Sequence, residues 1–141
     1  MLHQGPVPPL VHGLIEYAAA VLFIVAPFLF EFEETSATAA SIVVGLVVLA
    51  FTAVSELPTG LVRSVSTGVH VTADVVLAVL LVALPFVLGF RDEGAPTALF
   101  ITLGVLHLLV TIATNFPTRA DGDHGSDHGN HGDHDDREAL A

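Results

Sequence analysis

The feature that most constrains this chain is a set of four long apolar runs, at residues 9–30, 37–57, 69–90 and 96–116. Each run is long enough for a helix that crosses the hydrocarbon core of a bilayer, which takes about 20 residues. In lipid, every backbone N–H and C=O must be bonded within its own segment, so helices are favoured although Val and Ile are abundant. The runs therefore predict an all-α protein with four transmembrane helices.

The sequence also contains an internal duplication. A shift of 58 residues aligns His12 with His70, Glu16 with Asp74, Pro27 with Pro85, and Phe32 with Phe90. A shift of 59 residues then aligns Gly45 with Gly104, Ser55 with Thr114, and Pro58 with Pro117. Each unit crosses the membrane twice, so both units keep one orientation. We expect a four-helix transmembrane bundle of two tandem helical hairpins, related by a pseudo-two-fold axis along the membrane normal.

The runs and the duplication divide the chain into five parts. These are a lead at residues 1–8, repeat 1 at 9–58, a connector at 59–68, repeat 2 at 69–117, and a tail at 118–141. The tail is rich in Gly, Asp and His, and it has almost no apolar residues before its last three. We expect the tail to be disordered, because it has too little apolar surface to fold alone.

The composition excludes several classes of function. The chain has no cysteine, and its four basic residues are all Arg, against fifteen carboxylates. Disulfides and thiolate metal sites are therefore absent, and no basic patch could bind nucleic acid. A chain that lacks Lys and is rich in acidic residues is typical of proteins from salt-loving archaea, since molar salt shortens the Debye length to about 3 Å. The alternative is an acidic membrane protein without halophilic adaptation.

Loop charges predict the orientation in the membrane. Arg63 and Arg119 lie on the side of the termini, whereas Arg91 on the opposite side has Asp92 and Glu93 beside it. Because basic residues favour the cytoplasmic side, we expect a multi-pass protein of the cell membrane with both termini in the cytoplasm.

Two motifs carry a resemblance to a known family. The first repeat has His12-Gly-x-x-Glu16-Tyr17 and Ala26-Pro27-Phe28, and the second has His70-x-x-x-Asp74 and Leu84-Pro85-Phe86 after Gly60-Leu-Val-Arg63. Over about residues 11–117 the chain resembles the SPW repeat family of small integral membrane proteins. The resemblance implies four transmembrane helices in two repeats and no assigned activity. Ser and Trp of the family motif are replaced here by Ala26 and Phe28, and by Leu84 and Phe86, so no polar Ser-Trp pair is expected.

Ionisable residues inside the apolar runs are the candidate functional residues. In each repeat a His and an acid four positions later share one helix face, because residues i and i+4 are neighbours. Such residues usually face protein or water rather than lipid, and they often mark function. We expect one polar cluster in the cytoplasmic half of the bundle, formed by His12, Glu16, Tyr17, His70, Asp74 and His107.

Three functions are compatible with this cluster. The leading one is a structural or interaction component of the membrane, in which each His bonds its own acid and the pairs tie the hairpins together. The alternatives are a proton or cation path, and a haem or metal site on the paired His residues, with haem the less expected group. An enzyme is not expected, because no nucleophile–base set or phosphate loop is visible. The expected partners are the lipid bilayer and either further copies of the chain or another membrane protein.

Two other sets of residues have specific roles in this interpretation. Pro27 and Pro85 each remove an N–H inside an apolar run and are expected to kink their helices, as a fixed bend or as a hinge. The tail could bind Zn, Ni or Cu weakly, or act only as a solubilising segment. Its candidate ligands are His124, His128, His131 and His134.

Overall fold

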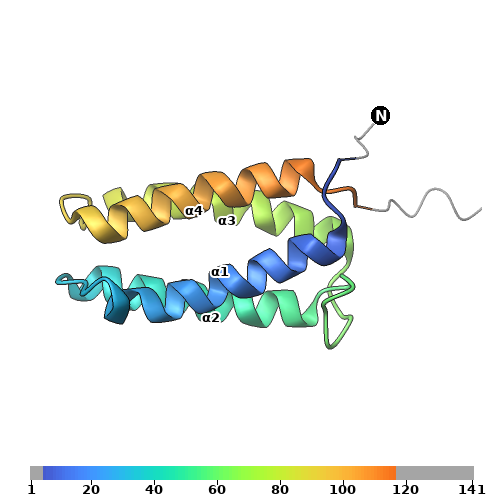
Figure 1. Cartoon of the computed structure of the whole chain (residues 1–141), viewed down its shortest axis with the longest axis horizontal. Helices are drawn as coiled ribbons and strands as arrows, with labels where there is room; N and C mark the ends of the chain where they lie inside the picture. The colour runs from blue at the N-terminus through green and yellow to red at the C-terminus, as the bar shows by residue number, and fades with distance from the viewer. Residues whose placement is uncertain (1–4, 117–141) are drawn as a thin grey trace, which may run out of the picture.

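The computed structural model describes residues 5–116, which form four α-helices. They are α1 (Pro9–Leu29), α2 (Thr35–Val54), α3 (Thr67–Val87) and α4 (Gly94–Ala113). Figure 1 shows two helical hairpins side by side, α1 with α2 and α3 with α4, with both ends of the described chain at the same end of the bundle. Within residues 5–116, β-structure is limited to two isolated bridges. The prediction of an all-α bundle of two tandem hairpins is confirmed. The tail and its four His residues lie outside the described residues.

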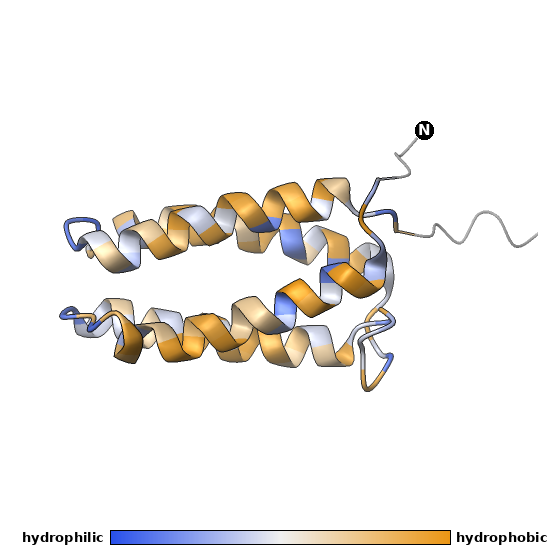
Figure 2. Cartoon of the chain, in the orientation of Figure 1, coloured by the Kyte–Doolittle hydropathy of each residue, from blue (hydrophilic) through white to orange (hydrophobic). Residues whose placement is uncertain are grey.

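Each helix is long and apolar enough to span a membrane. The helices have 20 or 21 residues and a mean hydropathy of 1.8–2.3 over their most apolar windows. At 1.5 Å per residue, 20 residues cover about 30 Å, the thickness of a hydrocarbon core. Only 28–33% of each window is buried inside the bundle, so most of the apolar surface faces outwards. Figure 2 shows the hydrophilic residues of the helix ends and loops flanking this apolar band. These features indicate a multi-pass membrane protein.

One glycine brings the two helices of each hairpin close together. A Cβ on Gly45 of α2 would lie 2.7 Å from the Ala20 carbonyl oxygen and from Ile24 Cγ1 on α1. A Cβ on Gly104 of α4, the equivalent position in repeat 2, would lie 3.0 Å from Leu81 Cβ on α3. Close backbone approach through a small residue is a common way to pack helices in lipid, where van der Waals contact is a main attraction.

An aromatic group fills the half of the bundle near the α1–α2 and α3–α4 loops. The ring of Phe100 packs edge-on against Phe23 and Phe90, with centroid distances of 5.2 and 5.3 Å. All three rings are buried. In repeat 1 the position equivalent to Phe100 is Ser41, whose hydroxyl donates to the Phe23 carbonyl at 2.5 Å. The duplication is therefore broken here, and one ring from repeat 2 fills the space between the hairpins.

Hydrogen bonds join the hairpins at both ends. At the loop end, the Glu93 carboxylate accepts from the backbone N–H groups of Glu33 at 2.7 Å and Glu34 at 3.1 Å, beside the start of α2. A carboxylate at this place offsets the partial positive charge of a helix N-terminus. At the other end, the Val7 N–H donates to Ala113 and the Asn115 N–H donates to Val7, both at 3.1 Å.

The two prolines lie near helix ends. Pro27 is two residues before the end of α1, and Pro85 is two residues before the end of α3. Both are buried. Their effect on the direction of the helices stays a prediction.

Candidate functional site

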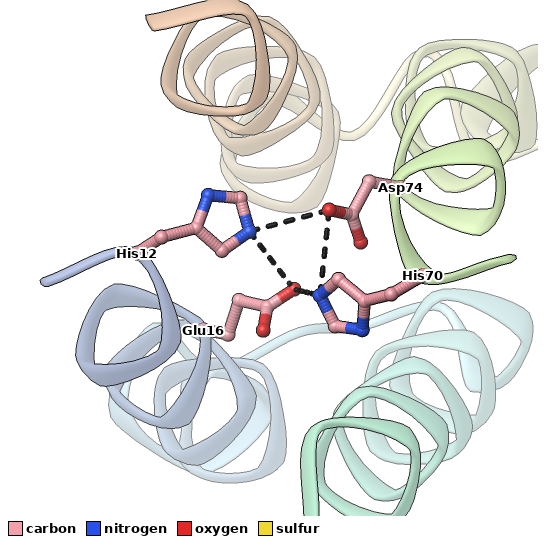
Figure 3. Close-up of side chains that lie close together, drawn as sticks. All are labelled: His12, Glu16, His70 and Asp74. Carbon is pink, nitrogen blue, oxygen red and sulfur yellow. Dashed lines mark ion pairs between the residues drawn. The ribbon is translucent and has the colours of Figure 1, made fainter. Parts of the chain in front are cut away.

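The four central side chains come from two helices. His12 and Glu16 lie on α1, and His70 and Asp74 lie on α3, each pair one helical turn apart. Figure 3 shows all four pointing into the space between the hairpins, where their nitrogen and oxygen atoms alternate around a ring. We call this set the ring cluster. It confirms that the two repeats direct their ionisable residues towards one another.

The distances around the ring are nearly equal. His12 Nε2 lies 3.2 Å from Asp74 Oδ2 and 3.4 Å from Glu16 Oε1. His70 Nε2 lies 3.2 Å from Glu16 Oε1 and 3.5 Å from Asp74 Oδ2. In both cases the carboxylate of the other hairpin is the nearer one. Each imidazole therefore pairs with both acids, and the arrangement is not two separate pairs within single helices.

The ring cluster is shielded from its surroundings. His12 and His70 are 0% exposed, Asp74 is 2% exposed and Glu16 is 3% exposed. Buried charged groups are strongly unfavourable unless they are paired or coordinate a metal. The charges of this cluster must therefore be balanced within the cluster itself.

A hydroxyl group from the opposite hairpin holds each imidazole. His12 Nδ1 lies 2.9 Å from Thr114 Oγ1, just after α4, and His70 Nδ1 lies 2.7 Å from Ser55 Oγ, just after α2. Ser55 and Thr114 are equivalent positions of the two repeats. Each repeat thus supplies the hydroxyl that orients the imidazole of the other repeat.

These hydroxyls determine which ring nitrogen carries a hydrogen. Ser55 Oγ donates to the Phe51 carbonyl at 2.7 Å, and Thr114 Oγ1 donates to the Val110 carbonyl at 2.6 Å. A hydroxyl has one hydrogen, so each must accept from the imidazole. Nδ1 is therefore the donor in both rings, and Nε2 of the neutral ring carries a lone pair.

The lone pairs point at acceptors. An ionised carboxylate has no hydrogen to donate. Nε2 of both rings and Asp74 Oδ2 are buried without a hydrogen-bond partner among the described residues. Two imidazole nitrogens and two carboxylate oxygens that converge in this way require positive charge between them.

The outer oxygens of the two acids have different neighbours. Glu16 Oε2 accepts from Thr52 Oγ1 at 3.1 Å, and this hydroxyl also lies 2.9 Å from the Val48 carbonyl. Asp74 Oδ1 faces His107 Nε2 at 3.5 Å. His107 is the position equivalent to Val48. The predicted member His107 therefore joins the cluster at its edge, next to one acid only.

Tyr17 does not join the cluster. Its hydroxyl donates to the carbonyl of Thr59 in the connector at 3.1 Å. The next residue along a helix is turned by about 100°, so Tyr17 faces a different direction from Glu16. The sequence analysis did not predict that the hydroxyls of Ser55 and Thr114 are the partners of the imidazoles. The duplication contained a signal for this, because Ser55 and Thr114 occupy equivalent positions in the two repeats, as His12 and His70 do.

A cavity reaches the ring cluster from one side. It has a volume of about 210 Å³ and lies between α2 and α3. Most of its lining is apolar, from residues such as Val47, Phe51, Val76 and Leu80, and Glu16 and Thr52 lie at its polar part. Glu16 is therefore the acid that adjoins free space.

Comparison with known proteins identifies the repeat. The family model described as SPW repeat domain matches residues 10–114. No curated protein and no solved structure matches the chain.

Proposed function

Because the chain belongs to the SPW repeat family, we propose that it is an integral membrane protein that holds a cation between its two repeats. The convergence of two imidazole lone pairs on two buried carboxylates carries this proposal. Each His contacts both acids at 3.2–3.5 Å, and its other nitrogen is engaged by a hydroxyl.

Charge balance supports the proposal. Glu16 and Asp74 together carry two negative charges when ionised, in a place that solvent does not reach. Two positive charges compensate them, supplied by a metal ion or by a proton on each imidazole. Either cation stabilises the closed bundle, because it joins side chains of α1 to side chains of α3.

A structural role is the second candidate, and one observation favours it. The contacts His12–Thr114 and Ser55–His70 each connect one hairpin to the other. Hydrogen bonds between helices in membranes contribute about 0.6 kcal/mol each, but they fix the register of the helices. In this case the chain is a structural or interaction component of the membrane, with further copies or another membrane protein as its partner. No enzymatic activity is proposed.

We also propose a cell-membrane location with both termini in the cytoplasm. Arg63 lies in the connector between the two hairpins, at the end of the bundle where the described chain begins and ends (Figure 1). The loops at the opposite end contain one basic residue, Arg91, whose Nε lies 3.8 Å from Asp92 Oδ1. Arg119 follows α4 in the sequence, so the side of the termini has two Arg residues against one. This distribution agrees with the preference of basic residues for the cytoplasmic side.

The test of the cation proposal compares the full chain with its Glu16→Gln/Asp74→Asn variant, both purified in detergent. Metal uptake is measured by titration calorimetry, and proton uptake by potentiometric titration. Because both proteins keep the tail, its His residues contribute equally, and the difference reports the ring cluster. We expect the variant to lose one metal ion or two protons. Equal uptake of both kinds by the two proteins would contradict the proposal.

A further inference from the structure

We propose that the cation of the ring cluster is a divalent transition-metal ion of the zinc type, bound by Nε2 of His12 and His70, Oε1 of Glu16 and Oδ2 of Asp74. This inference rests on the proposed cation function and specifies its ligand. It is argued from distances, donor chemistry, charge and the partners of each ligand.

Four of the six distances between donor atoms match the edges of a tetrahedral site. Zinc binds imidazole nitrogen at about 2.0–2.1 Å and carboxylate oxygen at about 2.0–2.2 Å, so neighbouring donors of a tetrahedron lie about 3.3–3.5 Å apart. The four nitrogen–oxygen distances of the ring cluster are 3.4, 3.2, 3.2 and 3.5 Å. All four donor atoms lie within 4.8 Å of one another. The nitrogen–nitrogen and oxygen–oxygen distances, which are at most 4.8 Å, must come to the same length as the nitrogen–oxygen distances to complete a tetrahedron around the metal.

The chemical types of the four donor atoms indicate which metal ions the site prefers. Magnesium and calcium are hard ions that take oxygen ligands, and magnesium also requires octahedral geometry. Two imidazoles with two carboxylates suit zinc and similar transition metals. Softer ions that prefer thiolates have no suitable donor here, because the chain contains no cysteine.

The charge of the site matches a divalent ion. Two neutral imidazoles and two carboxylates carry a total of two negative charges, so a divalent ion makes the complex neutral. A neutral complex is favoured in a buried membrane site, since a net charge would have a large desolvation cost. A monovalent ion would leave one charge uncompensated.

Both imidazoles have a supporting hydroxyl, and both acids have a polar neighbour at the outer oxygen. Thr114 and Ser55 accept from Nδ1–H of His12 and His70, which leaves Nε2 free to bind a metal. Thr52 Oγ1 lies 3.1 Å from the outer oxygen of Glu16 and 2.9 Å from the Val48 carbonyl, and these two acceptors share its one hydrogen. His107 Nε2 lies 3.5 Å from the outer oxygen of Asp74. Metal-binding His residues generally donate their other N–H in this way, and loss of such a partner weakens metal binding by about 10–100-fold.

The cavity between α2 and α3 gives the site a direction of approach. Glu16 is the ligand that lines this cavity, and Thr52 also lines it. Asp74 has a polar neighbour on α4 instead, His107, at the position equivalent to Val48 of repeat 1. We therefore expect Glu16 to exchange more readily than Asp74 as the metal enters or leaves.

The test uses the full chain stripped of metal and reloaded with Zn²⁺ or Co²⁺ in detergent. To remove tail binding, the four tail His residues are replaced by Asn in every protein compared, at positions His124, His128, His131 and His134. We expect one Zn²⁺ per chain and the intense visible absorption of tetrahedral Co²⁺. His70→Gln should abolish both signals. Thr114→Val should weaken binding by about 10–100-fold, and Tyr17→Phe, outside the ring cluster, should leave it unchanged.

A second measurement keeps the test decisive if the ligand variants fail to fold. X-ray absorption of the Zn²⁺-loaded chain should show four nitrogen or oxygen neighbours at about 2.0–2.1 Å with imidazole scattering. A six-coordinate spectrum, or less than stoichiometric zinc, would overturn the inference. If zinc fails to bind while Glu16→Gln/Asp74→Asn still alters proton uptake, the metal inference fails and the cation proposal stands. If proton uptake is also unaltered, both fail.

Discussion

His12 Nε2 lies 3.2 Å from Asp74 on the other hairpin, nearer than the 3.4 Å to Glu16 on its own helix. The same relationship holds for His70 and Glu16. The expected pairing of each His with its own acid is therefore only half of the arrangement. Contacts between the repeats complete the ring. The stability of the whole bundle therefore depends on whether a cation balances the charges of the cluster.

The first prediction concerns the stability of the bundle. His12→Ala combined with His70→Ala should lower the melting temperature in detergent, because it removes the two imidazoles that pair with the buried carboxylates of Glu16 and Asp74. Breaking a buried ion pair from one side typically costs about 3–5 kcal/mol. Thermal unfolding followed by circular dichroism measures the effect. The control is Val79→Ala, at a lipid-facing position of α3. Equal melting of the double variant and the control would rule out a stabilising role.

The second prediction concerns the hydroxyls. Ser55→Ala and Thr114→Val should each lower the free energy of unfolding by about 0.5–1.5 kcal/mol, since a buried Nδ1–H loses its acceptor. The exchanges Ser55→Thr and Thr114→Ser should have little effect, because each introduces the residue of the equivalent position. A double-mutant cycle in denaturant measures the coupling. Strict additivity of the two losses would show that the two imidazoles do not act as one unit.

The third prediction concerns the packing of the hairpins. Gly45→Ala should destabilise the first hairpin by about 1–3 kcal/mol, because the new Cβ meets a carbonyl oxygen at 2.7 Å. Gly104→Ala should cost less, since its nearest contacts are side-chain atoms at 3.0 Å. Gly68→Ala is the control, with nothing within 4 Å of its Cβ. Thermal unfolding should rank the three variants in this order, and a larger effect at Gly68 would contradict it.

The fourth prediction concerns salt. Five carboxylates gather in the two loops at one end of the bundle, at Glu31, Glu33, Glu34, Asp92 and Glu93. Because molar salt reduces the Debye length to about 3 Å, it should weaken their mutual repulsion and raise the melting temperature. Thermal unfolding in dilute and in molar KCl measures this change. Glu31→Gln with Asp92→Asn should reduce the salt effect, and equal stability of the parent chain in both buffers would count against halophilic adaptation.

Much of the fold could be predicted from the sequence. The four helices follow from apolar length, since a segment in lipid must bond its own backbone. The hairpins and their common orientation follow from the duplication. The pairs His12 with Glu16 and His70 with Asp74 follow from the spacing of four residues. Tyr17 was predicted as a member of the cluster but lies outside it, because helix geometry turns its side chain away from that of Glu16.

The sequence by itself determined which residues share a helix face, because local backbone geometry fixes that. Only the tertiary structure decided how the faces meet. The rotation of each helix about its axis depends on packing at places such as Gly45, Gly104 and Phe100, which lie outside the ring cluster. That packing brings Thr114 to His12 and Ser55 to His70. Each imidazole therefore bonds a hydroxyl of the other repeat, which only the packing of the two hairpins could decide. With Nδ1 bonded in this way, Nε2 of both rings faces the two acids.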